Sequence, residues 1–178
     1  MRSVLLVVLL TASASAGELD LSGGVTATTT AWPGDHGGGA ALDASWWFRD
    51  WIGASFIAKE QYATVDDRLL SYFSVNVAVR HPVGPLRLTG TLGLVHQHEE
   101  PRAALMDAPL EGALGVGDGI RHRAGGRAGV SIALPVTQLA HGDVFVALDL
   151  DATVFADNDR GPRWMAGAGL ALGFTRRL

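Results

Sequence analysis

The sequence contains no cysteine, and beyond its first residues it contains no long apolar run. The lack of cysteine excludes disulfides, thiolate nucleophiles and cysteine-ligated zinc. No stretch after residue 16 approaches the roughly 20 apolar residues that a transmembrane helix needs. An excess of basic charge is also lacking, since 14 Lys and Arg stand against 18 Asp and Glu. This balance argues against a nucleic-acid partner.

The first residues have the features of an export signal. Arg2 precedes an apolar core from Val4 to Leu10, and Ala14-Ser15-Ala16 forms a small-residue cleavage site. The apolar core has about half of the roughly 20 residues that span a bilayer as a helix. The sequence therefore predicts a cleaved signal peptide at residues 1–16 and one exported domain at residues 17–178.

The rest of the chain shows period-two alternation of apolar and polar residues, which is typical of β-strands. In the segment VFVALDLDATVF, Val144, Val146, Leu148 and Leu150 alternate with residues that include Asp149 and Asp151. Similar segments of about ten residues recur along the chain. Each predicts a strand with one apolar face and one polar or glycine-rich face.

Such strands fit either a soluble barrel with its apolar face inward or an outer-membrane barrel with its apolar face toward lipid. The polar phase carries charges of both signs and many small residues, which suits a narrow, filled interior. Aromatic residues gather near the strand ends, as interfacial girdles require. These are Trp46, Phe48, Trp51, Tyr62 and Trp164. The pattern favours the outer-membrane barrel, and a soluble lipocalin-like barrel is the alternative.

The number of strands depends on the segment around Gly125-Gly126. A turn there gives nine strands, whereas one continuous strand from His122 to Val136 gives eight. Bacterial single-chain barrels have even strand numbers, so we predict eight. The expected periplasmic turns are Arg49-Asp50, residues 81–85 and residues 137–143, and the expected outer loops are residues 33–39, 63–68, 97–119 and 156–163.

The chain resembles the small OmpA-like outer-membrane β-barrel proteins. The resemblance rests on the signal peptide, the segment SWWFRDWIGASF (Ser45 to Phe56) and the terminal GLALGFTRRL (Gly169 to Leu178). It departs from the family at the last residue, where Leu178 replaces the usual aromatic. The resemblance implies an all-β fold, namely a closed, antiparallel, eight-stranded, up-and-down transmembrane barrel. It also implies a location in the bacterial outer membrane, in contact with its lipid, but no reaction. We expect a monomer.

The polar phase places a set of charged side chains inside the barrel. The expected interior network is Arg121, Arg123, Arg127, Asp149 and Asp151, with Asp20, Asp43, Lys59 and Arg87 as further inward charges. Charges in a closed interior are tolerated chiefly in pairs, and eight strands leave just enough room for side chains. We therefore predict a structural ion-pair plug, with a narrow ion path as the alternative.

The stretch GLVHQHEEPR contains the candidate metal ligands. His96, His98 and Glu99, with His122 on the next predicted strand, form a set that suits zinc or copper. The alternative interpretation is a strand end that leaves the bilayer for water, with its polar residues near lipid phosphates.

Two further hypotheses concern function. Lipid A deacylases show a His-x-Ser pair on a lipid-facing strand, but no Ser or Thr lies within several residues of His96 or His98, so the sequence offers no nucleophile for a lipid-modifying enzyme. The function predicted instead is structural or interaction-related. Its candidate contact surface, for an extracellular ligand or protein, is the loop at residues 97–119.

Overall fold

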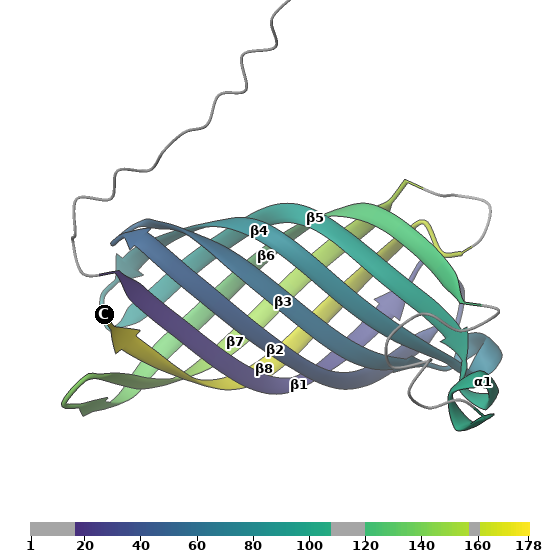
Figure 1. Cartoon of the computed structure of the whole chain (residues 1–178), viewed down its shortest axis with the longest axis horizontal. Helices are drawn as coiled ribbons and strands as arrows, with labels where there is room; N and C mark the ends of the chain where they lie inside the picture. Colours follow the sequence, from purple (N-terminus) through teal and green to yellow (C-terminus); the bar gives the residue numbers. More distant parts are fainter. Residues whose placement is uncertain (1–16, 108–119, 157–160) are drawn as a thin grey trace, which may run out of the picture.

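The computed structural model describes residues 17–107, 120–156 and 161–178, so the predicted signal peptide lies outside the described residues. The described chain forms one closed barrel in which each strand pairs with the next and β1 pairs with β8 (Figure 1). The strands are β1 (Glu18–Thr30), β2 (His36–Arg49), β3 (Ile52–Ala63), β4 (Arg68–Val83), β5 (Leu86–Pro101), β6 (Arg121–Leu139), β7 (Gly142–Phe155) and β8 (Trp164–Arg177). A 3-10 turn, η1 (Val65–Asp67), and a short helix, α1 (Arg102–Asp107), complete the described elements.

Closure of the barrel comes from the antiparallel pairing of β1 with β8, which runs from Glu18 opposite Arg177 to Thr30 opposite Met165. A closed sheet leaves no edge strand with unpaired backbone groups. The predicted fold class, a closed antiparallel barrel of eight strands, is confirmed. Of the described helices, none is long and apolar enough to cross a membrane.

β6 is a single strand through Gly125-Gly126, as predicted. Gly125 pairs with Val95 of β5 and Phe155 of β7, so no turn interrupts the ladder there. The register of β6 against β7 shifts only between Pro135 and Thr137. A bulge at this point has a simple cause, because proline has no N–H to donate to the ladder.

The two ends of the barrel differ, and we name them by their connections. The turn end carries residues 50–51, 84–85 and 140–141, and the chain also enters β1 and leaves β8 there. The loop end carries η1 and α1 (Figure 1). Gly84 has a φ of 60°, a left-handed conformation that suits glycine in a tight turn.

Several connections are shorter than the sequence predicted. β4 continues to Val83, into the turn predicted at residues 81–85, and β6 continues to Leu139, into the turn predicted at residues 137–143. The outer loop predicted at residues 33–39 ends earlier, because β2 begins at His36. At residues 97–119, β5 continues to Pro101 and α1 follows, while residues 108–119 lie outside the described part. These predictions were wrong because strand pairing extends past the apolar segments into polar sequence, where alternation of hydrophobicity no longer marks a strand.

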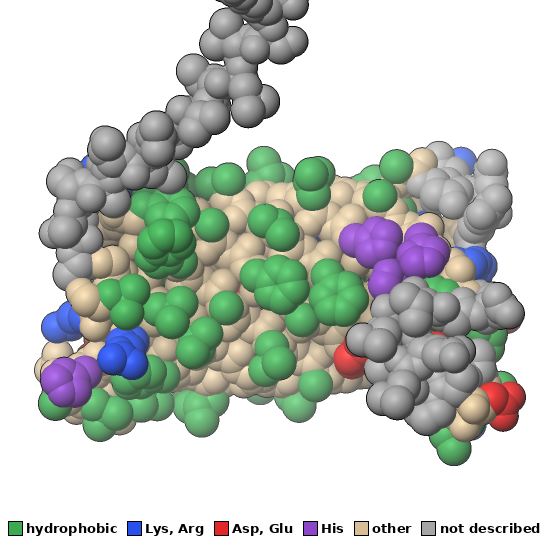
Figure 2. Space-filling view, in the orientation of Figure 1, with side chains coloured by type: hydrophobic (Ala, Val, Ile, Leu, Met, Phe, Trp, Pro, Cys, Tyr) green, Lys and Arg blue, Asp and Glu red, His purple; other side chains and the backbone are tan. Residues whose placement is uncertain are grey.

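Hydrophobic side chains cover much of the middle of the barrel on the face seen in Figure 2. Leu42 is 67% exposed, Leu92 70% and Leu94 76%. The neighbours of opposite phase point inward, so Trp47 and Tyr72 are buried while Trp46 is exposed. Trp46 and Trp51 lie toward the turn end and Tyr62 and Trp164 toward the loop end, all exposed. The apolar phase thus faces outward, with aromatics near both ends.

Candidate metal centre and the charged barrel interior

The interior near the loop end is organised around one buried carboxylate, that of Glu99. Arg123 Nη1 lies 2.9 Å from Glu99 Oε1, and Arg68 Nη1 lies 3.1 Å from Oε2. Arg121 Nη2 is 3.2 Å from Oε2, and Arg68 also binds Asp35 at 2.5 Å. Glu99, Arg68, Arg123 and Asp35 are fully buried, so this cluster fills the barrel beneath its loop end.

A second group of charges lies in the middle of the barrel. Lys59 Nζ is 2.5 Å from Asp151 Oδ1, and Arg127 Nε is 3.7 Å from Asp151 Oδ2. Arg127 also donates to the Thr91 hydroxyl at 2.7 Å. Asp149, on the same face of β7, forms no ion pair among the described residues. Asp151 is therefore the carboxylate that pairs with both Lys59 and Arg127.

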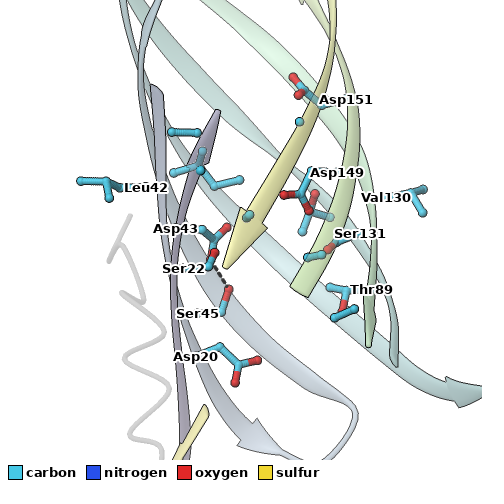
Figure 3. Close-up of a pocket in the computed structure, with 18 of the residues that line it drawn as sticks. Asp20, Ser22, Leu42, Asp43, Ser45, Thr89, Val130, Ser131, Asp149 and Asp151 are labelled. Carbon is cyan, nitrogen blue, oxygen red and sulfur yellow. Dashed lines mark hydrogen bonds between the residues drawn. The ribbon is translucent and has the colours of Figure 1, made fainter. Parts of the chain in front are cut away.

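A small cavity of about 100 Å³ adjoins this middle group (Figure 3). Asp43 and Asp149 point into it, and the Ser45 hydroxyl donates to Asp43 at 2.7 Å. Leu42 points the other way, toward the outside. A polar space of this size holds a few waters and is smaller than the roughly 300 Å³ of a ligand pocket.

A third group closes the turn end. Arg80 lies 2.5 Å from Glu18 and 3.7 Å from Asp20, and Arg87 lies 3.7 Å from Asp20. The Trp47 indole donates to Asp20 at 2.8 Å, and the Arg80 guanidinium stacks over the Trp47 ring. Ion-pair layers thus occupy the interior at both ends and in the middle.

The five residues of the predicted interior network all belong to the inward phase, but they divide between two groups. Arg121 and Arg123 bind Glu99, and Arg127 binds Asp151. Asp149 stands beside the cavity. Sequence reasoning missed Glu99 as the partner of Arg121 and Arg123, together with Arg68 and Asp35, which join that group. It also missed the ion pair of Arg80 with Glu18 at the turn end.

The three histidines of the candidate metal set come together on the outer face near the loop end (Figure 2). His98 on β5 lies directly opposite His122 on β6, and His96 lies two residues earlier on the same face of β5. The Nε2 atoms of His96 and His98 are 2.8 Å apart, and His122 Nδ1 is 3.3 Å from His96 Nε2. His96 and His122 are exposed, and His98 is half-buried. His98 Nδ1 is buried and has no hydrogen-bond partner among the described residues.

The structure corrects the fourth residue of that set. Glu99 is 1% exposed, and its carboxylate is bound by arginines inside the barrel. The cause is the period of the strand, because successive side chains point to opposite faces and Glu99 follows the outward His98. Glu99 therefore does not join the imidazoles.

A serine that the sequence does not place near the histidines lies beside them in the barrel. Ser71 on β4 pairs with His98 on β5, so both point outward in one row. The Ser71 hydroxyl donates to Glu60 Oε2 at 2.9 Å, and among the described residues no hydrogen bond joins it to an imidazole. A serine therefore does lie next to the histidines in the folded barrel, although none is near them in the sequence. Its hydroxyl, however, donates to a carboxylate and does not contact a histidine that could act as a base.

This architecture is that of small eight-stranded outer-membrane β-barrels of the OmpA-like kind. Neisserial surface protein A has a TM-score of 0.60 at 8% identity, covering 91% of this chain and 97% of that chain. Ail, the attachment invasion locus protein of Yersinia pestis, has a TM-score of 0.53 at 14% identity, covering 92% and 99%. OprG from Pseudomonas aeruginosa has a TM-score of 0.52 at 11% identity, covering 92% and 97%. No protein-family model and no curated protein matches the sequence.

Proposed function

We propose that the protein is a monomeric barrel of the bacterial outer membrane, closed to solutes by its ion-paired interior, with a structural or interaction role. The observation that carries this proposal is the inverted distribution of side chains. Large apolar residues such as Leu92 and Leu94 face outward, while Lys59 and Arg127 are paired inside. Water would disfavour such a surface, whereas lipid favours it.

The assignment of sides follows from the two ends of the barrel. Outer-membrane barrels have short periplasmic turns and longer outer loops. The turn end then faces the periplasm and the loop end faces outward. The predicted signal peptide at residues 1–16 supplies the export step that this location requires.

The first test is folding and insertion of the untagged mature chain. We expect a barrel that migrates differently on a gel before and after heating, and that floats with liposomes in a density gradient. A chain that stays soluble without lipid or detergent, with no heat-dependent band, would contradict the proposal.

The second test is conductance. Three layers of ion pairs cross the interior of the described barrel, so we expect no regular single-channel steps when the folded protein is added to a planar bilayer. Reproducible steps of one size would support the narrow ion path instead. The protein used here must first pass the gel and liposome test. An absence of conductance steps then cannot be explained by unfolded protein.

The interaction role is assigned to the loop end, where α1 follows β5. Ail has been solved in complex with the heparin analogue sucrose octasulfate, with a TM-score of 0.51 at 14% identity to this chain. That ligand gives a first probe for an extracellular contact here. Binding of sucrose octasulfate that is lost when residues 102–119 are replaced by a short Gly/Ser turn would support a ligand surface, and binding that survives the replacement would place it elsewhere.

A further inference from the structure

We propose that His96, His98 and His122 bind one divalent transition-metal ion of the zinc or copper type on the outer face of the barrel, at its loop end. One nitrogen from each of the three rings lies within 4.8 Å of the other two. The inference goes beyond the proposed role of the barrel and does not depend on it.

The spacing of two of the nitrogen pairs is close to what a metal imposes. Two imidazole ligands at 2.0–2.1 Å from a tetrahedral zinc lie about 3.3 Å apart. His122 Nδ1 and His96 Nε2 are 3.3 Å apart, and the Nε2 atoms of His96 and His98 are 2.8 Å apart. Two of the three nitrogen pairs therefore lie near this spacing, and the third pair is within 4.8 Å, so rotation of the side chains has to bring the three nitrogens together around an ion.

The strand pairing holds the three imidazoles in this arrangement. β5 and β6 pair without a register shift from Arg87 opposite Ala133 to Glu99 opposite Arg121, so His98 stays opposite His122. The rings of His98 and His122 lie 4.6 Å apart, and those of His96 and His98 lie 4.7 Å apart. A site built on paired strands is more rigid than one built on loops.

The ligand atoms select the class of ion. Three neutral nitrogens and no carboxylate suit Zn²⁺, Cu²⁺ or Ni²⁺ rather than Ca²⁺ or Mg²⁺, which prefer oxygen. Three protein ligands leave a further coordination position for water or another ligand, since Glu99 points into the barrel. His98 Nδ1 has no second hydrogen bond among the described residues to fix its ring. We therefore expect weaker binding than in a site where every imidazole is so oriented.

Binding of lipid phosphate by the same cluster is less favoured by the geometry. Ion pairing with a phosphate would need protonated rings, and positive charges this close repel one another. The hydrogen bond between the Nε2 atoms of His96 and His98 requires one of the two nitrogens to be unprotonated and to accept from the other. A metal ion would replace this hydrogen bond, because coordination uses the lone pair of each nitrogen.

The test uses the untagged mature protein folded in detergent, titrated with Zn²⁺ by calorimetry and with Cu²⁺ by electron paramagnetic resonance. We expect one ion per barrel, with nitrogen hyperfine structure for copper. His96→Ala, His98→Ala and His122→Ala should each weaken binding at least about tenfold. His36→Ala is the matched control, because His36 is an exposed histidine of the same end outside the cluster, and it should bind like the wild type.

Each variant is first checked for its heat-dependent gel band, so that loss of metal is not confused with loss of fold. His96→Ala and His122→Ala change exposed positions and serve as the test if His98→Ala does not fold. A folded wild-type barrel that binds no stoichiometric ion would overturn the site while leaving the proposed barrel intact. Equal binding by the cluster variants and His36→Ala would also overturn it.

Discussion

Asp151 is the carboxylate on which two cations of the barrel interior depend. Lys59 and Arg127 both lie within 4 Å of it, and all three side chains are at most 6% exposed. Removing one member of a buried ion pair leaves an uncompensated charge, which costs more than the pair itself contributes. Asp151 should therefore contribute more to the stability of the barrel than Asp149 does.

We expect Asp151→Asn to lower the free energy of unfolding by about 3–5 kcal/mol, because Lys59 and Arg127 lose their partner. The measurement is guanidinium unfolding of the protein in liposomes, followed by tryptophan fluorescence. Asp149→Asn is the matched control, since Asp149 forms no ion pair among the described residues, and it should change stability by no more than about 1 kcal/mol. An equal loss of stability in both variants would mean that both carboxylates stabilise the buried cations.

The sequence predicts which face each of these residues occupies but not the partner it finds. The alternation around Asp149 and Asp151 shows that both point inward. It does not show that Lys59, from a strand far away in the chain, reaches Asp151, because that depends on the register around the closed barrel. The same alternation already separates Glu99 from His98, so this misassignment was avoidable. The pairing of Ser71 with His98 was not predictable in this way.

The continuity of β6 is decided by the sheet rather than by its glycines. Gly125-Gly126 reads as a turn in isolation, yet the inward and outward phases persist across it. The even strand number of bacterial single-chain barrels favours one strand. Strand number could thus be predicted, whereas strand ends could not, because pairing extends into segments such as Thr137-Gln138 that lack an apolar signal.

A pair of neighbouring substitutions tests this arrangement. Gly126 faces outward with free space around it, so Gly126→Ala should raise stability by about 0.5–1 kcal/mol. A Cβ at Gly125 would lie 2.5 Å from the Val154 carbonyl oxygen of β7, so Gly125→Ala should lower stability by about 1–3 kcal/mol. Guanidinium unfolding in liposomes measures both. Similar effects of the two changes would indicate a turn in place of the continuous strand.

The connection after β5 offers a second test of the same pairing. The ladder between β5 and β6 lies within Arg87–Glu99 and Arg121–Ala133, before and after the loop. Replacing residues 102–119 by a short Gly/Ser turn should therefore leave the heat-dependent gel band in place, because loop length changes stability only slowly. Loss of the band would show that the loop is part of the folded barrel and would weaken its assignment as a contact surface.

The described barrel wall turns its large apolar residues outward and encloses ion-paired charges, the reverse of a soluble barrel. Leu92 on the middle of β5 is 70% exposed, while Arg123 and Glu99 are fully buried. This inversion is stable only if the surroundings of the barrel are less polar than its interior. The solvent around the outer surface is therefore the property that most directly separates a membrane barrel from a lipocalin-like one.

The stability of a variant with a charge at the middle of the outer surface shows whether that surface faces lipid or water. In lipid we expect Leu92→Arg to lower the free energy of unfolding by about 2–4 kcal/mol, because the guanidinium must enter the middle of the bilayer. Val83→Arg, also outward and 51% exposed but at the turn end, should cost about 0–1 kcal/mol. In water both exposed changes would stay within about 0.5 kcal/mol. Unfolding titrations in liposomes give the difference, and equal costs at the two positions would contradict a membrane-spanning barrel, because only a bilayer makes the penalty depend on depth.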